Sequence, residues 1–254
     1  SRTPLISALK FLEQEKLVES VPRRGFFVRL FSKEEMVYIF ELREVLEGLA
    51  ARRAAAKITE AQIKTLNRFF QPFAKQKDIL WKFHTLIWGS QYPKWMDGLS
   101  KADQLKEVEE WMDAIKARYP EIPMIDVVNE AMPTHAPPPF ADALGGSGST
   151  GYDWIINSFK MARERWPKSI LMYNDYNNIE WGNDVQYTYD LVKKMIEVGA
   201  PIDAIGCQGH DAFKKSTSEV KKNIDKLASL GLPIFITEYD IQVEDDNKQL
   251  SIMK

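Results

Sequence analysis

The sequence predicts an α/β fold in which a parallel sheet follows a mainly helical segment with one β-hairpin. From residue 83 onward, apolar stretches typical of strands alternate with helical stretches, with a period of about thirty to forty-five residues. The strands are expected at 83–88, 124–128, 169–173, 203–207 and 233–237, and the helices near 100–118, 151–165, 183–198 and 216–230. Such alternation indicates parallel strands joined by right-handed crossovers, in a sheet that is either open or closed into a barrel.

Composition also divides the chain into two parts. Residues 1–70 hold 13 Lys and Arg against 9 Asp and Glu, whereas the remainder holds 21 against 27. All seven Trp residues fall after position 80. We therefore expect two domains, residues 1–80 and residues 81–254.

The chain as a whole argues against several classes of protein. It carries 34 basic and 36 acidic residues, so its overall charge gives no indication of nucleic-acid binding. No apolar run approaches the roughly 18 residues of a membrane span, and Ser1 does not begin a secretory signal. Cys207 is the only cysteine, which excludes an internal disulfide, and its apolar surroundings predict a buried, unreactive thiol.

The amino-terminal elements are predicted from start signals and apolar spacing. A helix begins near Thr3 and Pro4, with apolar residues at three- and four-residue spacing behind them. Branched and aromatic runs on either side of residues 22–25 (PRRG) predict a hairpin with a basic tip. Capping signals at 32–35 and 59–62 predict a helix from residue 33 to about residue 57 and the start of another.

Three stretches of this segment resemble transcription regulators of the GntR type. Residues 1–9 (SRTPLISAL) are similar to the recognition helix of their winged helix-turn-helix, residues 21–28 (VPRRGFFV) to its wing, and residues 41–51 (ELREVLEGLAA) to the first helix of their ligand domain. The resemblance implies a fragment of a DNA-binding unit, because the two helices before the recognition helix are absent from the sequence. Arg2, Arg23 and Arg24 could contact phosphates, but a scaffold with ordinary surface arginines is the interpretation that we favour. Some of these regulators bind a metal through a helical Asp and His, but Leu80 stands four residues before His84, so no metal site is expected.

Glutamates follow two of the predicted strands. Glu130 comes after the strand at 124–128, and Glu238 repeats this plan after the strand at 233–237. Taken singly, each is more typical of a helix N-cap or a surface charge. As a pair at strand ends, they suggest acid/base or nucleophilic chemistry on a sugar bond.

The loops after the strands, which form the functional face of a parallel sheet, carry the other unusual side chains. These are Trp88, Gln91, Tyr92, Trp95, Asn129, residues 173–177 (YNDYN), residues 208–210 (QGH) and Asp240. Aromatic planes stack on sugar rings and amides exchange hydrogen bonds with hydroxyls, so this set suits a carbohydrate. His84 alone would read as a core histidine, and His135, in a Pro-rich loop, is expected to be exposed.

Five motifs from residue 82 onward resemble glycoside hydrolase family 10, the retaining endo-β-1,4-xylanases. They stand in family order at 84–88 (HTLIW), 126–131 (DVVNEA), 174–177 (NDYN), 205–210 (IGCQGH) and 236–240 (ITEYD). The resemblance implies a (β/α) barrel of the TIM type and xylan as the substrate, with no cofactor and no metal. It implies Glu130 as the acid/base and Glu238 as the nucleophile.

The same resemblance implies a set of substrate-binding residues. Asn129 would hold the sugar 2-hydroxyl, and His210, between Glu238 and Asp240, would keep the nucleophile ionised, with Asp240 in a supporting role. The full substrate-binding set is His84, Trp88, Asn129, Tyr176, Gln208 and His210.

The match departs from the family in sequence and in length. Gly89 stands where many members carry His, and Tyr239 where many carry Leu. Five strands are matched, corresponding to the third through seventh of the eight in the family barrel. We therefore expect a partial barrel with impaired activity, whose open edges a homo-oligomer could cover. The join near residues 82–87 suggests an artificial fusion.

Two hypotheses follow for the function. The first is a xylan hydrolase, and the alternative is a non-catalytic engineered chimera or a GntR-type DNA-binding fragment. Release of reducing sugar from xylan discriminates between them. An extracellular location is expected for the xylanase-like part and a cytoplasmic one for the regulator-like part; neither a membrane nor a nucleic-acid partner is expected.

Overall fold

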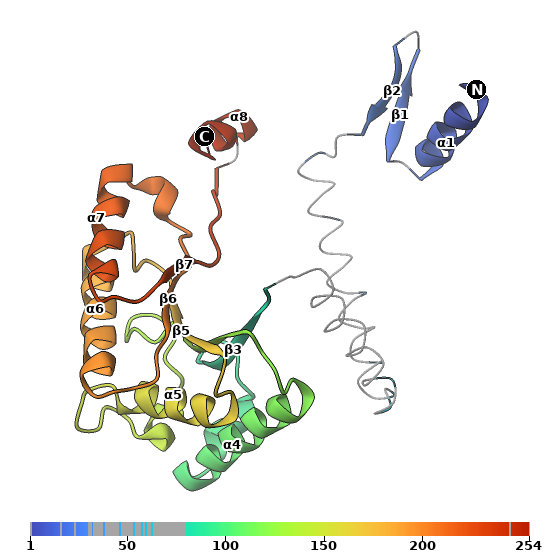
Figure 1. Ribbon diagram of the computed structural model, residues 1–254. Coiled ribbons are helices and arrows are strands. Elements are labelled where there is room, and N and C mark those ends of the chain that lie inside the picture. The colour runs from blue at the N-terminus through green and yellow to red at the C-terminus, as the bar shows by residue number, and fades with distance from the viewer. Residues whose placement is uncertain are drawn as a thin grey trace. The chain divides into compact units, whose positions relative to one another are not determined.

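The computed structural model describes residues 2–15, 17–22, 24–29, 80–243 and 245–253, together with the single positions 32, 38, 46, 53, 57, 59 and 62. The chain divides into two compact units, Ser1–Phe69 and Phe70–Lys254 (Figure 1). This division lies somewhat earlier than the expected one after residue 80.

The first unit contains the predicted amino-terminal helix and hairpin. Helix α1 (Arg2–Gln14) is followed by strands β1 (Val18–Val21) and β2 (Gly25–Val28), which pair antiparallel. At 59–62, the backbone N–H of Thr59 donates to Oε1 of Gln62, and the N–H of Gln62 donates to Oγ1 of Thr59, which are the reciprocal bonds of a capping box. The predicted helix at 33–57 lies, apart from single positions, outside the described residues.

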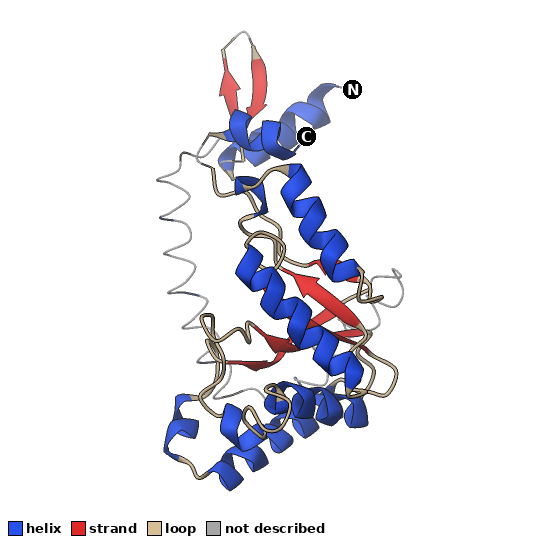
Figure 2. Cartoon of the chain, turned by 90° about the vertical axis from the view of Figure 1, so that its left-hand side faces the viewer, coloured by secondary structure: helices blue, strands red, loops and turns tan. Residues whose placement is uncertain are grey.

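The second unit contains a parallel sheet with the predicted strand–helix alternation. Its strands are β3 (Lys82–Trp88), β4 (Met124–Asn129), β5 (Ile170–Asp175), β6 (Ala204–Cys207) and β7 (Ile234–Ile236), and they lie side by side in chain order. The helices between them are α4 (Lys101–Arg118), α5 (Asp153–Arg165), α6 (Gly182–Glu197) and α7 (Thr217–Ala228). Figures 1 and 2 show these helices packed along the sheet. The predicted α/β fold is confirmed, and the arrangement is that of part of a (β/α) barrel.

Shorter elements were not anticipated from the sequence. Three 3₁₀ turns, η1 (Lys94–Gly98), η2 (Ala141–Leu144) and η3 (Ala212–Lys214), lie in loops that follow strands, and helix α8 (Asp246–Met253) comes last. None of the helices in the described part of the chain is long and apolar enough to cross a membrane.

Burial and capping explain why these segments form these elements. Every residue of β4 is buried, and because successive residues of a strand face opposite sides, both faces of β4 are covered. Helices α4 and α7 begin after Ser100 and Ser216, whose side chains accept hydrogen bonds from the backbone N–H groups of Asp103 and Glu219. The core therefore lies between the strands and their helices, which leaves the carboxyl ends of the strands for polar side chains.

Candidate active site

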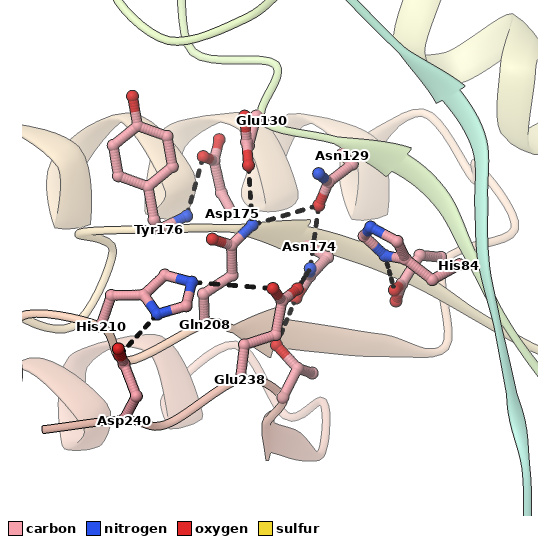
Figure 3. A network of polar contacts seen from close by, with 12 residues as sticks. His84, Asn129, Glu130, Asn174, Asp175, Tyr176, Gln208, His210, Glu238 and Asp240 are labelled. Carbon is pink, nitrogen blue, oxygen red and sulfur yellow. Dashed lines mark hydrogen bonds and ion pairs between the residues drawn. The ribbon is translucent and has the colours of Figure 1, made fainter. Parts of the chain in front are cut away.

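The polar side chains at the carboxyl ends of the strands lie at one level of the sheet. Trp88 on β3 is in register with Asn129 on β4, Asn129 with Asn174 on β5, and Asn174 with Gly206 on β6. Because the strands are parallel and in sequential order, the residues that follow them meet at the same edge (Figure 3).

Glu130 has an unusual backbone conformation at the end of β4. Its φ of 56° lies in the left-handed region, which costs a non-glycine residue about 1–2 kcal/mol. Backbone hydrogen bonds hold it there, since Glu130 N–H donates to the carbonyl of Asn174 at 2.9 Å and Ala136 N–H donates to the carbonyl of Glu130 at 3.0 Å. Strain that is held in this way is a feature of functional positions.

The carboxylate of Glu130 accepts hydrogen bonds from two neutral donors. The indole Nε1 of Trp88 lies 2.8 Å from Oε2, and Nε2 of Gln208 lies 3.1 Å from Oε1. Both donors come from the ends of other strands. The direction of this carboxylate is therefore fixed from two sides.

Glu238 has a different environment beyond the end of β7. Its Oε1 accepts a hydrogen bond of 2.9 Å from Nδ2 of Asn174, and its Oε2 lies 3.6 Å from Nε2 of His210. The other nitrogen of His210 lies 2.7 Å from Oδ1 of Asp240. Burial alone would raise the pKa of Asp240, but its hydrogen bonds from His210 and Gln242 outweigh burial and lower that pKa. An ionised Asp240 thus orients the imidazole toward Glu238.

Asn174 connects the two halves of the site; the sequence placed it in the loop at 173–177 but gave it no role of its own. Its Nδ2 donates to Oδ1 of Asn129 at 2.9 Å as well as to Glu238, and its Oδ1 accepts from Oγ1 of Thr237 at 2.7 Å. The side chain crosses above Gly206, where an added Cβ would come within 2.4 Å of Asn174 Oδ1. A signal did exist in the sequence, because Asn174 opens the 174–177 motif at a strand end.

Asn129 combines two satisfied contacts with an unpaired donor. Its Oδ1 accepts from Asn174 and, at 3.3 Å, from Gln208. Its Nδ2 is buried and has no hydrogen-bond partner among the described residues. A buried unpaired donor costs about 1–3 kcal/mol, so this amide would gain from a hydroxyl that reaches it.

His84 and Tyr176 lie at the margins of this network. Nδ1 of His84 is 2.8 Å from Oδ2 of the buried Asp126, and its ring meets that of Trp88 edge to face at 5.7 Å. The ring of Tyr176 stacks on His135, with centroids 3.6 Å apart and planes 15° apart. Through Asn174, the structure joins the other predicted site residues in one network, namely Trp88, Asn129, Glu130, Gln208, His210, Glu238 and Asp240 (Figure 3).

The expectation that His135 is exposed is wrong. Its side chain is 5% exposed, with Nδ1 2.6 Å from Oδ1 of Asp175. The Pro-rich loop that carries it packs against Gly89, whose N–H donates to the carbonyl of Ala136 at 2.9 Å. A Cβ at position 89 would lie 2.3 Å from that same carbonyl oxygen. The absent side chain at Gly89 therefore makes room for the loop.

The arrangement provides two carboxylates with distinct surroundings at the edge of a sheet lined by aromatic and amide side chains. Among the described residues, no group of three or more His, Cys, Asp or Glu side chains could hold a metal ion. The chemistry that such a pair supports is proton transfer by one carboxyl group and nucleophilic or electrostatic action by the other.

Comparison with known proteins relates this arrangement to one family. A family model described as glycosyl hydrolase family 10 matches residues 38–254. The match begins well before residue 82 and so includes residues 38–80 of the expected first domain.

Several similar curated proteins and solved structures are named as xylanases. Endo-1,4-beta-xylanase B of Cellvibrio japonicus is 40% identical over 179 residues, which are 70% of this chain and 28% of that protein. Endo-1,4-beta-xylanase B of Thermotoga neapolitana is 34% identical over 172 residues, covering 66% of this chain and 49% of that protein. The chain therefore spans half or less of these two relatives.

Native xylanase 10B from Thermotoga maritima superposes with a TM-score of 0.63 at 26% identity, covering 76% of this chain and 60% of that one. A family 10 xylanase from Thermobacillus composti has a TM-score of 0.57 at 32% identity, covering 74% of this chain and 55% of that one.

Proposed function

Since the chain belongs to glycosyl hydrolase family 10, we propose that it carries the catalytic centre of a retaining endo-β-1,4-xylanase. The observation that carries this proposal is the bridge of amides between the two carboxylates. Gln208 contacts both Glu130 and Asn129, and Asn174 contacts both Asn129 and Glu238. Side chains from four strand ends thereby hold an acid and a nucleophile in one site.

In the proposed reaction, the two glutamates act in sequence. Glu238 attacks the anomeric carbon while Glu130 gives its proton to the departing glycosidic oxygen, which leaves a xylosyl group bonded to Glu238. Glu130, now ionised, takes a proton from water as the water displaces Glu238. The configuration at the anomeric carbon is inverted twice and hence retained.

The surrounding residues suit these roles. His210, held by Asp240 at 2.7 Å, places its Nε2 3.6 Å from Oε2 of Glu238 and so helps to orient that carboxylate for attack. The unpaired Nδ2 of Asn129 is available for a sugar hydroxyl, and the rings of His84, which is exposed, and of Trp88 and Tyr176, which are partly exposed, suit a sugar ring. We assign His84, Trp88, Asn129, Tyr176, Gln208 and His210 to substrate binding.

The test is hydrolysis of xylan by this chain. Reducing ends should appear, and proton NMR should show the β-anomer as the first product. Glu238→Gln should abolish turnover with an unchanged thermal midpoint, whereas Asp190→Asn, on the outer surface of α6, should leave turnover intact. The α-anomer as first product would exclude retention. A folded wild-type protein without activity would favour the non-catalytic alternative.

The level of activity is a further part of the proposal. The described residues supply five parallel strands, whereas the family resemblance implies eight, and one side of β3 and of β7 is unpaired within the described sheet. We expect a rate below that of an intact relative, and a second copy of the chain that covers the open edges. Light scattering and kcat/KM beside an intact xylanase test both points.

For the first unit, we propose a scaffold role. Its helix α1 and hairpin β1–β2 stand where the regulator resemblance implies a recognition helix and a wing, but Arg24 lies over the ring of Phe27 at 5.5 Å within the hairpin. Sequence-selective nanomolar binding to DNA at physiological salt would contradict this role.

A further inference from the structure

His135 lies in a turn whose backbone closes on Glu130. The N–H of His135 donates to the carbonyl of Met132 at 2.8 Å, and the N–H of the next residue, Ala136, donates to the carbonyl of Glu130 at 3.0 Å. The turn 130–136 therefore begins at Glu130, the residue with the left-handed backbone, and is closed by a hydrogen bond back to the carbonyl of that residue. Contacts that hold the side chain of His135 should therefore also hold the backbone of this turn.

Both ring nitrogens of His135 face carboxylates. Nδ1 lies 2.6 Å from Oδ1 of Asp175, and Nε2 lies 3.6 Å from Oδ2 of Asp184. A neutral imidazole has one N–H, so two acidic partners favour the doubly protonated cation. Burial would lower the pKa of His135, but the hydrogen bond and charge of Asp175, followed by the charges of Asp184 and Glu130, outweigh burial and raise that pKa.

Asp175 is itself fixed at the end of β5. Its Oδ1 also accepts from the N–H of Tyr176 at 2.9 Å, and its Oδ2 accepts from the hydroxyl of Tyr173 and from the N–H of Met132 at 3.4 Å. Its side chain is 1% exposed. Asp175 therefore joins the turn 130–136 to β5 through both Met132 and His135.

We propose that His135 is a positioning residue for Glu130, clamped as a cation between Asp175 and Asp184 so that the turn 130–136 aims the Glu130 carboxyl group at the leaving-group oxygen. The inference rests on the proposed function, in which Glu130 is the acid. The left-handed conformation of Glu130 is disfavoured for an L-residue, so it depends on such contacts. The ring of Tyr176, stacked on one face of the imidazole, also holds His135 in place.

The test compares substrates that do and do not need an acid. Dinitrophenyl β-xylobioside releases a stable phenolate without protonation, whereas phenyl β-xylobioside needs a proton at the departing oxygen. In His135→Phe, which keeps an aromatic ring against Tyr176 but removes both ion pairs, kcat/KM for the phenyl substrate should fall at least about tenfold. For the dinitrophenyl substrate, kcat/KM should stay within about threefold of wild type.

A matched control removes an ion pair elsewhere. Arg163 pairs with Asp203 at the opposite ends of the strands, so Arg163→Met should lower the thermal midpoint and leave the ratio of the two kcat/KM values unchanged. Equal losses on both substrates in His135→Phe, or no loss on either, would overturn the proposal. Wild-type protein inactive on both substrates would instead refute the proposed function.

A second measurement does not depend on activity. If His135 holds the turn, the Ala136 amide that donates to Glu130 should be protected from hydrogen exchange in wild type and exchange at least about tenfold faster in His135→Phe. The milder Asp184→Asn, which keeps the Asp175 contact, should give a smaller change in the same direction and serves if His135→Phe does not fold. An unchanged Ala136 exchange rate in a folded variant would overturn the proposal.

Discussion

Asn174 on β5 donates a hydrogen bond of 2.9 Å to Glu238, which follows β7 two strands away. The contact is possible because the intervening strand carries Gly206 at the register position of Asn174. A side chain at that position would fill the space that the amide crosses. The direction of Glu238 therefore depends on a residue that does not belong to its own strand or loop.

Removal of this amide should impair catalysis more than stability. Asn174→Ala takes away donors to Glu238 and Asn129, and we expect kcat/KM on xylan to fall roughly tenfold to a thousandfold, because aligned donors in an active site contribute effects of this order. Steady-state kinetics and a thermal melt of the same sample measure both effects. Retained activity would show that Glu238 is held by other contacts.

Gly206→Ala should produce the same defect without touching the amide itself. The new Cβ would come within 2.4 Å of Asn174 Oδ1 and 3.0 Å of Met172 Sδ, so the amide must move, and overpacking costs about 1–3 kcal/mol. The control is Gly182→Ala, since a Cβ at Gly182 meets nothing within 4 Å. Equal kcat/KM in the two variants would contradict the role given to Gly206.

Gly89→Ala should displace the Pro-rich loop. Its Cβ would lie 2.3 Å from the carbonyl oxygen of Ala136 and 2.4 Å from that of Pro137, both of them backbone atoms. We expect the free energy of unfolding to fall by at least about 1–3 kcal/mol, and activity to fall because the turn at Glu130 moves with the loop. Gly98→Ala, where the added Cβ has nothing within 4 Å, is the control in urea denaturation.

Stability should decline as pH rises through the titration of Glu180. This side chain is 1% exposed, and burial raises its pKa, which the backbone N–H of Ile179 at 3.0 Å offsets in part. Because the pKa of Glu180 is raised on folding, its contribution to the free energy of unfolding is complete below the pKa of the unfolded state, about 4.5. The contribution is lost as pH rises through the pKa of the folded state. Glu180→Gln should therefore lose less stability than wild type between about pH 4 and about pH 8.

Urea midpoints at both ends of that range provide the measurement. His135, whose pKa is also raised, adds a loss in the same direction at pH values above about 6.5. The difference between wild type and Glu180→Gln isolates the carboxyl group. Parallel pH curves for the two proteins would mean that Glu180 is ionised in the folded state.

Cys207 should not react with thiol reagents while the protein is folded. It is fully buried on β6, and burial raises the pKa of its thiol far above the usual range. A disulfide reagent should therefore label it at the rate of unfolding, and urea should accelerate the labelling. Rapid labelling of native protein would show that β6 opens locally.

The sheet could be predicted from the sequence because its strands are short apolar runs bounded by turn residues, and three of them, β4, β5 and β6, are buried along almost their whole length. Strand β4 is the clearest case, predicted at 124–128 and found at Met124–Asn129. Glu130 and Glu238 could be proposed as a pair because each comes within two residues of the end of such a run.

The contacts of His135 and Asn174 could not be predicted in this way, because their partners come from distant parts of the chain. The carboxylate that meets His135 lies 40 residues further on, and the one that meets Asn174 lies 64 residues further on. A Pro-rich loop is usually exposed, and no local pattern in the sequence shows that the histidine in this loop pairs with a buried carboxylate. Contacts of this kind become visible when the strands are set in register.

Position 89 and the loop over it are coupled, which bears on how such sequences can be exchanged. The carbonyl of Ala136 occupies the place that a side chain at position 89 would need, so a bulky residue there and this loop exclude each other. Transferring this loop alone into a relative with a bulky residue at position 89 should be destabilising, whereas transferring the loop together with Gly89 should be tolerated. The effects of the two changes on the free energy of unfolding should therefore be strongly non-additive. Recombination between homologues should succeed when residue 89 and residues 134–140 come from the same parent.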